Sequence, residues 1–177
     1  MASCFVIQSN SLFRDSWSYP NGYSNNEAAI IVEDMKHWIP IVIVILALLG
    51  AADSVYMTLA HYKLISASAV ESSGACPLTG RTCATVITSP RATIAGIPHA
   101  VLGVGYFALL AGAALWRIRI GHWFAPWEML AFLAAGFAWS IFLTQELLIQ
   151  LHIPCPYCLT AHFLNAVIVA LYALSFR

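Results

Sequence analysis

Four long stretches of the chain are almost continuously apolar, and polar segments separate them. Each stretch is close to the ~20 residues that a helix needs to cross the ~30 Å hydrocarbon core of a bilayer. The runs do not alternate apolar and polar positions as half-buried strands do, so the pattern predicts helices. The stretches are Ile39–Ala60, Ile97–Trp116, Trp127–Ile149 and Tyr157–Phe176. The sequence therefore predicts an all-α integral membrane protein with a four-transmembrane-helix bundle.

The N-terminal segment differs from the rest of the chain. Residues 1–34 are rich in Ser, Asn, Gly and Tyr and keep no helical period. This pattern predicts a mobile polar tail ahead of a membrane domain over residues 35–177. A rival interpretation makes Lys36–Ala52 a cleaved signal peptide. The apolar run continues to Leu59, which is too long for the short hydrophobic region of such a signal.

Composition supports a membrane location and excludes one class of partner. Hydrophobic residues make up 60% of the 177 residues and charged residues only 9%, whereas a soluble domain carries about 25% charged residues. Eight basic and eight acidic residues give a formal net charge of zero. Nucleic-acid binding needs a basic face, so we expect no nucleic-acid partner.

The basic residues predict the orientation in the membrane. Arg117 and Arg119 lie in the short connection between the second and third stretches, and short cytoplasmic connections are enriched in Lys and Arg. We therefore expect a multi-pass protein of the cell membrane with both termini cytoplasmic. The long connection His61–Gly96 then faces the oxidising periplasmic or extracellular side, as does the segment before the fourth stretch. Cys76, Cys83, Cys155 and Cys158 then all lie on that side of the membrane, where disulfides persist.

The segment Cys155-Pro156-Tyr157-Cys158 opens the fourth apolar stretch. Residues three apart on a helix are neighbours, so the two sulfurs can bond or separate with little backbone movement. Pro156 suits the first helical position, where its missing N–H would have no partner. The positive end of the helix dipole stabilises a thiolate, and a lower thiol pKa favours disulfide exchange. Cys155 and Cys158 are therefore candidate redox residues.

A second pair, Cys76 and Cys83, lies in the long outward connection, which is rich in Ser, Thr, Gly and Pro. Taken alone, the pair is best interpreted as a static bridge that pins this loop. Beside a CxxC motif on the same membrane face, a relay of two cysteine pairs is favoured. One pair would meet a soluble thiol protein, and the other would meet an acceptor dissolved in the membrane.

A metal site is a competing interpretation of the CxxC segment. His152 and His162 flank it as His-x2-Cys-x2-Cys-x3-His, and zinc binds Cys and His at such spacings. A compact four-ligand set would conflict with a helix that begins at Pro156. We therefore expect no metal here.

Taken in order, these residues resemble the microbial members of the vitamin K epoxide reductase family over about residues 38–176. The resemblance rests on four features that follow one another along the chain. They are Gly50–Tyr56 with His61 after it, the pair Cys76 and Cys83, Ser89 followed by Gly96-Ile97-Pro98 and Gly103, and the Cys155–Cys158 motif.

The resemblance implies a fold and a path for electrons. The family fold is a four-helix bundle around a quinone, with the long outward loop as a cap over the quinone site. Cys158 would transfer electrons to the quinone, and Cys155 would exchange with Cys83. Cys76 would be the first to meet the partner. A separate thioredoxin-like thiol protein on the outer side is implied, because no such domain is fused to this chain.

The resemblance also implies quinone contacts, for an electron acceptor of the menaquinone, ubiquinone or phylloquinone type. Ser89 would hydrogen-bond a quinone carbonyl or help to hold the cap. His99 stands where the family often has Asn, and His162 where some members have Tyr. Both histidines keep a hydrogen-bond donor. Arg91 stands where the family frequently has an aromatic residue. Animal members reduce an epoxide, but here reduction of a quinone is expected.

The expected function is therefore that of a quinone-dependent thiol–disulfide oxidoreductase that forms protein disulfides. One alternative has the cysteine pairs in reverse order, as in disulfide-forming quinone reductases with CxxC in the first outward loop; here the CxxC comes last. The other alternative is non-enzymatic, a membrane protein with structural disulfides or a Cys/His metal carrier.

Three polar or small residues inside the apolar stretches allow further predictions. Ionisable groups in a membrane face the bundle interior or water, so two interpretations of Asp53 are open. It is part of a proton path or a brace near the quinone, or it is a protonated or paired carboxyl that bonds neighbouring helices. Gly105 and Gly112 are predicted to allow close helix contact.

Overall fold

The structure is a computed structural model, and it describes residues 25–66, 86–87, 89, 92–150, 152 and 155–175 of the chain. The chain divides into two units, Met1–Asp34 and Met35–Arg177. Most of the outward loop lies outside the described residues, and with it the predicted cap over the quinone site. Cys76 and Cys83 also lie outside them.

The first helix, α1, spans Asn25–His61. It begins within the segment predicted to be an irregular tail, so the described part of the first unit is helical. No Gly or Pro interrupts the sequence between Asn25 and Pro40, and these are the residues least compatible with a helix. Within the second unit, His37–His61 is the apolar part of α1 that is long enough to span a membrane.

A short hairpin that was not predicted precedes the second long helix. Strand β1, Thr93–Ile94, pairs antiparallel with strand β2, Ile97–Pro98. The two connecting residues, Ala95 and Gly96, have φ values of 50° and 82°. Positive φ at both central positions defines the tight turn that matches the twist of paired strands.

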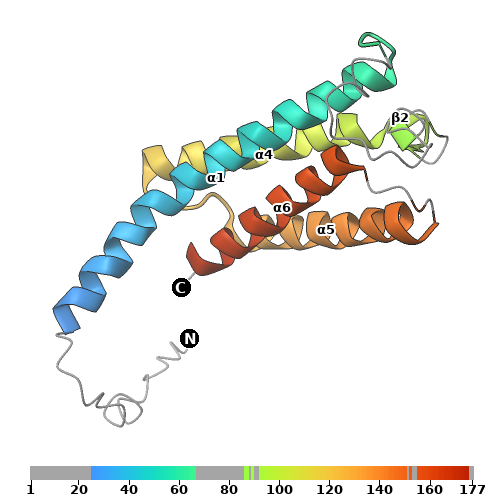
Figure 1. Ribbon diagram of the computed structural model, residues 1–177. Coiled ribbons are helices and arrows are strands. Elements are labelled where there is room, and N and C mark those ends of the chain that lie inside the picture. Colours follow the sequence, from blue (N-terminus) through green and yellow to red (C-terminus); the bar gives the residue numbers. More distant parts are fainter. Residues whose placement is uncertain are drawn as a thin grey trace, which may run out of the picture. The chain divides into compact units, whose positions relative to one another are not determined.

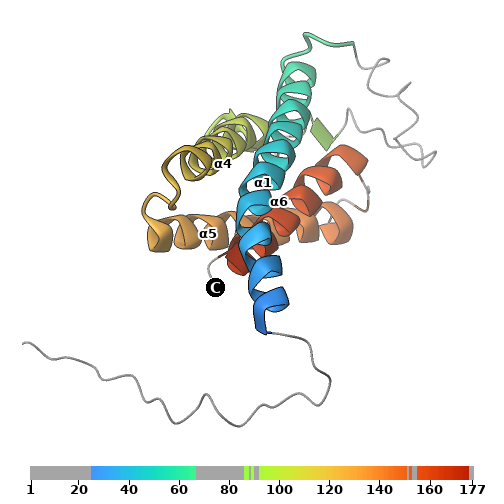
Figure 2. The same cartoon turned by 90° about the vertical axis from the view of Figure 1, so that its left-hand side faces the viewer.

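Three more long helices complete the second unit. They are α4 (His99–Ile120), α5 (Pro126–Gln145) and α6 (Pro156–Ser175). The five-residue π-helix η3, Glu146–Gln150, continues α5. α5 and α6 pack along each other (Figures 1 and 2). Cys155 follows the last residue of η3 by five positions in the sequence.

An apolar core at the centre of the second unit receives side chains from all four long helices. It includes Ala47 of α1, Phe107 of α4, Leu133 of α5 and Tyr172 of α6, none more than 4% exposed. Gly50 lets α1 approach α4, because a Cβ atom there would lie 2.6 Å from the Phe107 ring.

Gly105 and Gly112, which were predicted to allow close helix contact, do not lie at a close contact, whereas Gly136 does. A Cβ atom at Gly105 or Gly112 would meet nothing within 4 Å, so that prediction is wrong. At Gly136 of α5, by contrast, a Cβ atom would lie 2.5 Å from the Tyr106 ring. Which face of a helix meets its neighbour depends on the assembled bundle, and the apolar sequence around these glycines does not determine it.

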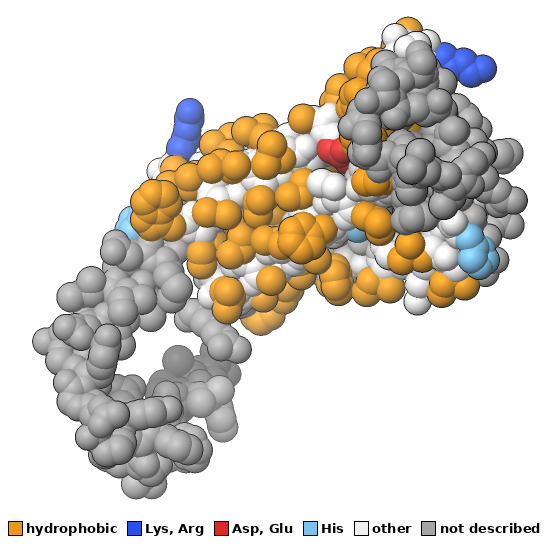
Figure 3. Space-filling model, in the orientation of Figure 1, with side chains coloured by type: hydrophobic (Ala, Val, Ile, Leu, Met, Phe, Trp, Pro, Cys, Tyr) orange, Lys and Arg blue, Asp and Glu red, His pale blue; other side chains and the backbone are white. Residues whose placement is uncertain are grey.

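The four long helices confirm the predicted membrane bundle. The spans long and apolar enough to cross a membrane are His37–His61, His99–Ile120, Pro126–Ile149 and Pro156–Ser175. Figure 3 shows apolar side chains over most of the face it presents, with Lys and Arg side chains near its ends. Large side chains such as Leu109, Trp127 and Phe163 are more than 60% exposed. An apolar surface of this kind is suited to lipid as its solvent.

Candidate thiol redox site

The CxxC segment forms the start of α6. Cys155 directly precedes the helix and Pro156 is its first residue. The backbone N–H of Leu159 donates to the carbonyl oxygen of Cys155 at 3.0 Å, which is the first hydrogen bond of the helix. Cys155 is thus the N-cap residue, the position whose side chain faces the unpaired amides of the first turn.

The two sulfurs of the motif lie side by side. The Cys158 thiol donates a hydrogen bond to Sγ of Cys155 over 2.9 Å, and both cysteines are free thiols. A disulfide needs about 2.05 Å between sulfurs, so a shift of about 0.9 Å would close the bond. Cys155 is fully buried, at 0% exposure, whereas Cys158 is half-buried. The pair has the geometry of a dithiol that can open and close.

Electrostatics favour a thiolate at Cys155. The hydrogen bond from Cys158 lowers the pKa of the Cys155 thiol below its ordinary value, and the backbone N–H groups of Cys158 and Tyr157 lower it further. Burial and the negative charge of Asp53 act in the opposite direction without reversing the shift. A thiolate attacks and leaves more readily than a thiol, so Cys155 is prepared for exchange.

An apolar cluster encloses the Cys155 sulfur. Met57 and Ala60 of α1, Leu147 of η3 and the segment Val86–Ile87 pack with Cys155 in this cluster. The π-helical turn at the end of α5 is the element that brings Leu147 to the thiol. Such turns often occur at functional sites.

The segment Val86–Ile87 is tied to α1 by a specific hydrogen bond. Nδ1 of His61 lies 2.7 Å from the carbonyl oxygen of Ile87. A carbonyl oxygen can only accept, so Nδ1 carries the hydrogen and donates it. Ser89 follows in a turn, where its N–H donates to Val86 and its carbonyl accepts from Ala92. Val86 and Ile87 are thereby held against the CxxC motif.

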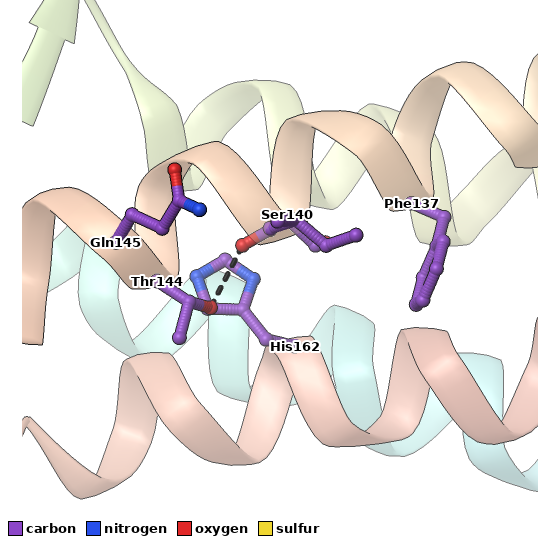
Figure 4. A pocket seen from close by; sticks show the side chains of 6 residues that line it. Phe137, Ser140, Thr144, Gln145 and His162 are labelled. Atoms are coloured by element: carbon purple, nitrogen blue, oxygen red, sulfur yellow. Dashed lines mark hydrogen bonds between the residues drawn. The ribbon is translucent and has the colours of Figure 1, made fainter.

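A small pocket lies between α5 and α6, and its lining residue His162 is one helical turn from Cys158. It has a volume of about 190 Å³ and is lined by Phe137, Ser140, Ile141, Thr144, Gln145 and His162. Figure 4 shows Thr144 and His162 projecting toward each other from the two helices. His162 follows Cys158 by four residues, a rise of about 6 Å along the helix.

A model of the vitamin K epoxide reductase family matches residues 41–173 of the chain. The chain belongs to the vitamin K epoxide reductase family. Membership agrees with the resemblance noted in the sequence, and it identifies the chain as an oxidoreductase of multi-pass membrane architecture. The matched range includes both cysteine pairs. A search of curated proteins found none that matches.

The three residues expected to contact the quinone of this vitamin K epoxide reductase homologue do not line one pocket. Only His162 lines the α5–α6 pocket. His99, the first residue of α4, stacks edge-on against Trp139 of α5, with ring centroids 5.8 Å apart. Ser89 lies in the turn after Val86–Ile87.

Among the described residues, no three His, Cys, Asp or Glu side chains are close enough to share a metal ion. His152 precedes the motif with a φ of 53° and is exposed.

Sequence reasoning missed a polar network inside the bundle. The Tyr106 hydroxyl donates to Oδ1 of Asn165 at 2.8 Å, and Nδ2 of Asn165 donates to Oγ of Ser140 at 2.8 Å. Asn165 is only 2% exposed. An amide inside an apolar transmembrane stretch is itself a signal, because buried polar groups in a membrane need partners. The sequence could have identified Asn165 on that ground, but not its partners.

Proposed function

We propose that this chain is a membrane enzyme that oxidises a thioredoxin-like partner and reduces a quinone through two cysteine pairs. The observation that carries the proposal is the Cys155–Cys158 pair, with sulfurs 2.9 Å apart at the start of α6 and a lowered pKa at Cys155. Family membership supports thiol–disulfide chemistry linked to quinone.

Covalent geometry supports exchange between the two pairs. Cys83 stands three residues before Val86, and Val86 packs in the cluster that contains Cys155. Three residues of extended chain reach at most about 10 Å. The hydrogen bond of His61 to Ile87 holds this attachment point near the thiols. The covalent chain limits how far Cys83 can lie from this attachment point, which supports the proposed exchange.

The proposed steps balance in electrons and protons. The partner dithiol becomes a disulfide, and its two electrons and two protons reduce the Cys76–Cys83 disulfide to two thiols. In the oxidised enzyme Cys155 and Cys158 form a disulfide; the Cys83 thiolate attacks Sγ of Cys155, which forms a Cys83–Cys155 bond, breaks the Cys155–Cys158 bond and releases the Cys158 thiolate. Cys76 then attacks Cys83, which restores the loop disulfide and releases Cys155.

The reduced Cys155–Cys158 pair then closes to a disulfide. Its two electrons and two protons go to the quinone, the second substrate, which leaves as the quinol. Cys158 is assigned the electron transfer to quinone because it is half-buried and precedes the pocket residue His162 by one helical turn, whereas Cys155 is enclosed. The family resemblance assigns the same roles.

The residues present fit a quinone headgroup. The α5–α6 pocket, at about 190 Å³, is smaller than the ~300–1,000 Å³ typical of sites for whole drug-sized ligands. It would hold a ring, with any prenyl tail outside it in lipid. His162 supplies a hydrogen-bond donor for a carbonyl oxygen. We retain Ser89 and His99 as proposed contacts or supports near the same end of the bundle.

The arrangement of charges supports a membrane orientation with the thiols on the outer, oxidising side. α4 begins near the cysteines, since Ala100 packs against the Cys155 cluster. It ends with Arg117 and Arg119 in its last turn. The 22 residues of α4 extend about 33 Å, roughly the thickness of the hydrocarbon core. If the arginines are cytoplasmic, the thiols lie at the opposite surface.

The proposal is tested by mixing purified, dithiol-reduced protein with a menaquinone or ubiquinone analogue without oxygen and following quinone absorbance. We expect rapid reduction by the wild type and loss of it in Cys155→Ser and Cys158→Ser. Cys4→Ser is the matched control, because it removes a thiol outside both pairs. Normal quinone reduction by Cys158→Ser would overturn the assignment.

A further inference from the structure

The network from Tyr106 to Ser140 connects three helices and ends at the α5–α6 pocket. Tyr106 lies on α4, Asn165 on α6 and Ser140 on α5. Both hydrogen bonds of the network measure 2.8 Å. Ser140 is also part of the pocket wall, together with His162. The network therefore joins the bundle interior to the proposed quinone site.

The Asn165 amide has a defined orientation in the structure. The Tyr106 hydroxyl donates to the amide oxygen, which therefore lies on the Tyr106 side. The NH₂ group must then point toward Ser140, as the second hydrogen bond shows. Gly136 provides the space for this arrangement, because a Cβ atom there would collide with the Tyr106 ring.

The fixed amide in turn determines what Ser140 can do. Its Oγ accepts the hydrogen bond from Asn165, so its own hydrogen must point elsewhere. Among the described residues, nothing accepts that hydrogen. The neighbouring Thr144 hydroxyl differs, because it donates to the Ser140 carbonyl oxygen at 2.7 Å. Ser140 thus keeps a donor for a molecule in the pocket.

We propose that the Ser140 hydroxyl donates a hydrogen bond to a carbonyl oxygen of the quinone headgroup, and that Asn165 and Tyr106 are positioning residues that aim it. This inference rests on the proposed function. A quinone ring carries acceptors and no donors at its carbonyls, which matches a pocket that offers donors from Ser140 and His162. A membrane-buried hydroxyl gains most from such a bond, because water does not compete for it.

Binding can be tested without redox chemistry. In the Cys155→Ser/Cys158→Ser double variant, we would measure affinity for menadione and for 2-methylnaphthalene, which has the same ring system and methyl group without carbonyls. Adding Ser140→Ala should weaken menadione binding by about fivefold, the value for one neutral hydrogen bond of ~1 kcal/mol. Binding of 2-methylnaphthalene should not change.

Ser175→Ala is the matched control. The Ser175 hydroxyl also belongs to a transmembrane helix, but it donates to the Tyr172 carbonyl oxygen of its own helix at 2.7 Å. We expect this variant to bind menadione as well as its parent does. Equal menadione affinity in Ser140→Ala and Ser175→Ala, or an equal loss of both ligands in Ser140→Ala, would overturn the assignment of Ser140.

The positioning role needs its own measurement. Tyr106→Phe removes the donor that fixes the Asn165 amide, so the amide can rotate and take the Ser140 hydrogen for itself. We expect about a threefold loss of menadione affinity, a loss that vanishes when Ser140 is already Ala. Additive losses would show that Tyr106 acts independently of Ser140 and would overturn this part of the proposal.

The two proposals can fail separately. If the wild-type dithiol does not reduce menadione but Ser140-dependent binding is found, the catalytic proposal fails and the donor site remains. If the dithiol reduces menadione and Ser140→Ala leaves both KM and binding unchanged, only the donor site is overturned.

Discussion

The hydrogen bond between His61 and Ile87 provides a direct test of the proposed role of the segment Val86–Ile87 in thiol exchange. It spans 2.7 Å, and Ile87 is only 7% exposed in the cluster that contains Cys155. His61→Leu would leave the Ile87 carbonyl without this donor. Losing a partner for a buried polar group costs about 1–3 kcal/mol, which corresponds to roughly 5- to 150-fold in an equilibrium. We expect formation of the Cys83–Cys155 bond to fall about tenfold.

The assay uses a Cys76→Ser/Cys158→Ser background, in which neither Cys76 nor Cys158 can break the mixed disulfide between Cys83 and Cys155. The fraction of this disulfide, formed in a defined redox buffer and quantified by mass spectrometry after alkylation, should fall in His61→Leu. His61→Asn should retain it, because Nδ2 of Asn lies close to the position of Nδ1 of His. His122→Leu is the matched control, since Nδ1 of His122 lies 3.4 Å from an exposed carbonyl oxygen, that of Trp123.

Equal yields of mixed disulfide in this background with and without His61→Leu would refute this reasoning. Misfolding is recognised by a second measurement in a chain that keeps both motif cysteines. Dithiothreitol can reduce the Cys155–Cys158 disulfide directly, without electrons passing through Cys76 and Cys83. Quinone reduction driven by dithiothreitol should therefore be unchanged in His61→Leu. If it falls in parallel with the exchange, His61 serves only the fold.

Three further predictions concern the thiol and the helix packing. Hydrogen bonds lower the pKa of Cys155, so this thiol should be alkylated at lower pH than a free cysteine. Cys158→Ala removes the largest cause of the lowered pKa and should move the alkylation midpoint upward. The same pKa shift stabilises the dithiol form of the protein; this contribution is complete above the ordinary thiol pKa and is lost as the pH falls through the lowered value. Asp53→Asn should move the alkylation midpoint downward, since the Asp53 charge raises the pKa of Cys155, and an unchanged midpoint would contradict this. Gly136→Ala should destabilise the fold by about 1–3 kcal/mol through overpacking, whereas Gly105→Ala, with open space around it, should not; thermal unfolding in detergent compares the two.

The four membrane spans could be predicted from the sequence because lipid imposes a simple requirement. Every backbone polar group in the bilayer must be satisfied within the segment, so a long apolar run has little choice but to form a helix. The observed span His99–Ile120 begins two residues later and ends four residues later than predicted. The end shifts because Gly121 supplies the left-handed cap, with φ of 88°, beyond the apolar run.

The details around the thiols could not be predicted in the same way. Cys155 and Cys158 were identified from their spacing and their place before an apolar helix. The π-helical turn that brings Leu147 to Cys155 follows from how α5 meets α6, and hydropathy carries no signal of it. The partners of Asn165 likewise belong to other helices. Such features depend on contacts between residues that are distant in sequence.

The enclosure of Cys155 gives the proposed relay its selectivity. A thiolate with a lowered pKa would react with many soluble disulfides and oxidants if it were exposed, but this sulfur is 0% exposed. Val86 and Ile87 are part of what covers it, and both belong to the segment that follows Cys83 in sequence. A sulfur attached to that segment can approach from within the cover, whereas a free thiol must first displace it. In the proposed relay, reactivity and burial at Cys155 are compatible, because the proposed attacking residue, Cys83, precedes the covering segment Val86–Ile87 by only three positions in the sequence.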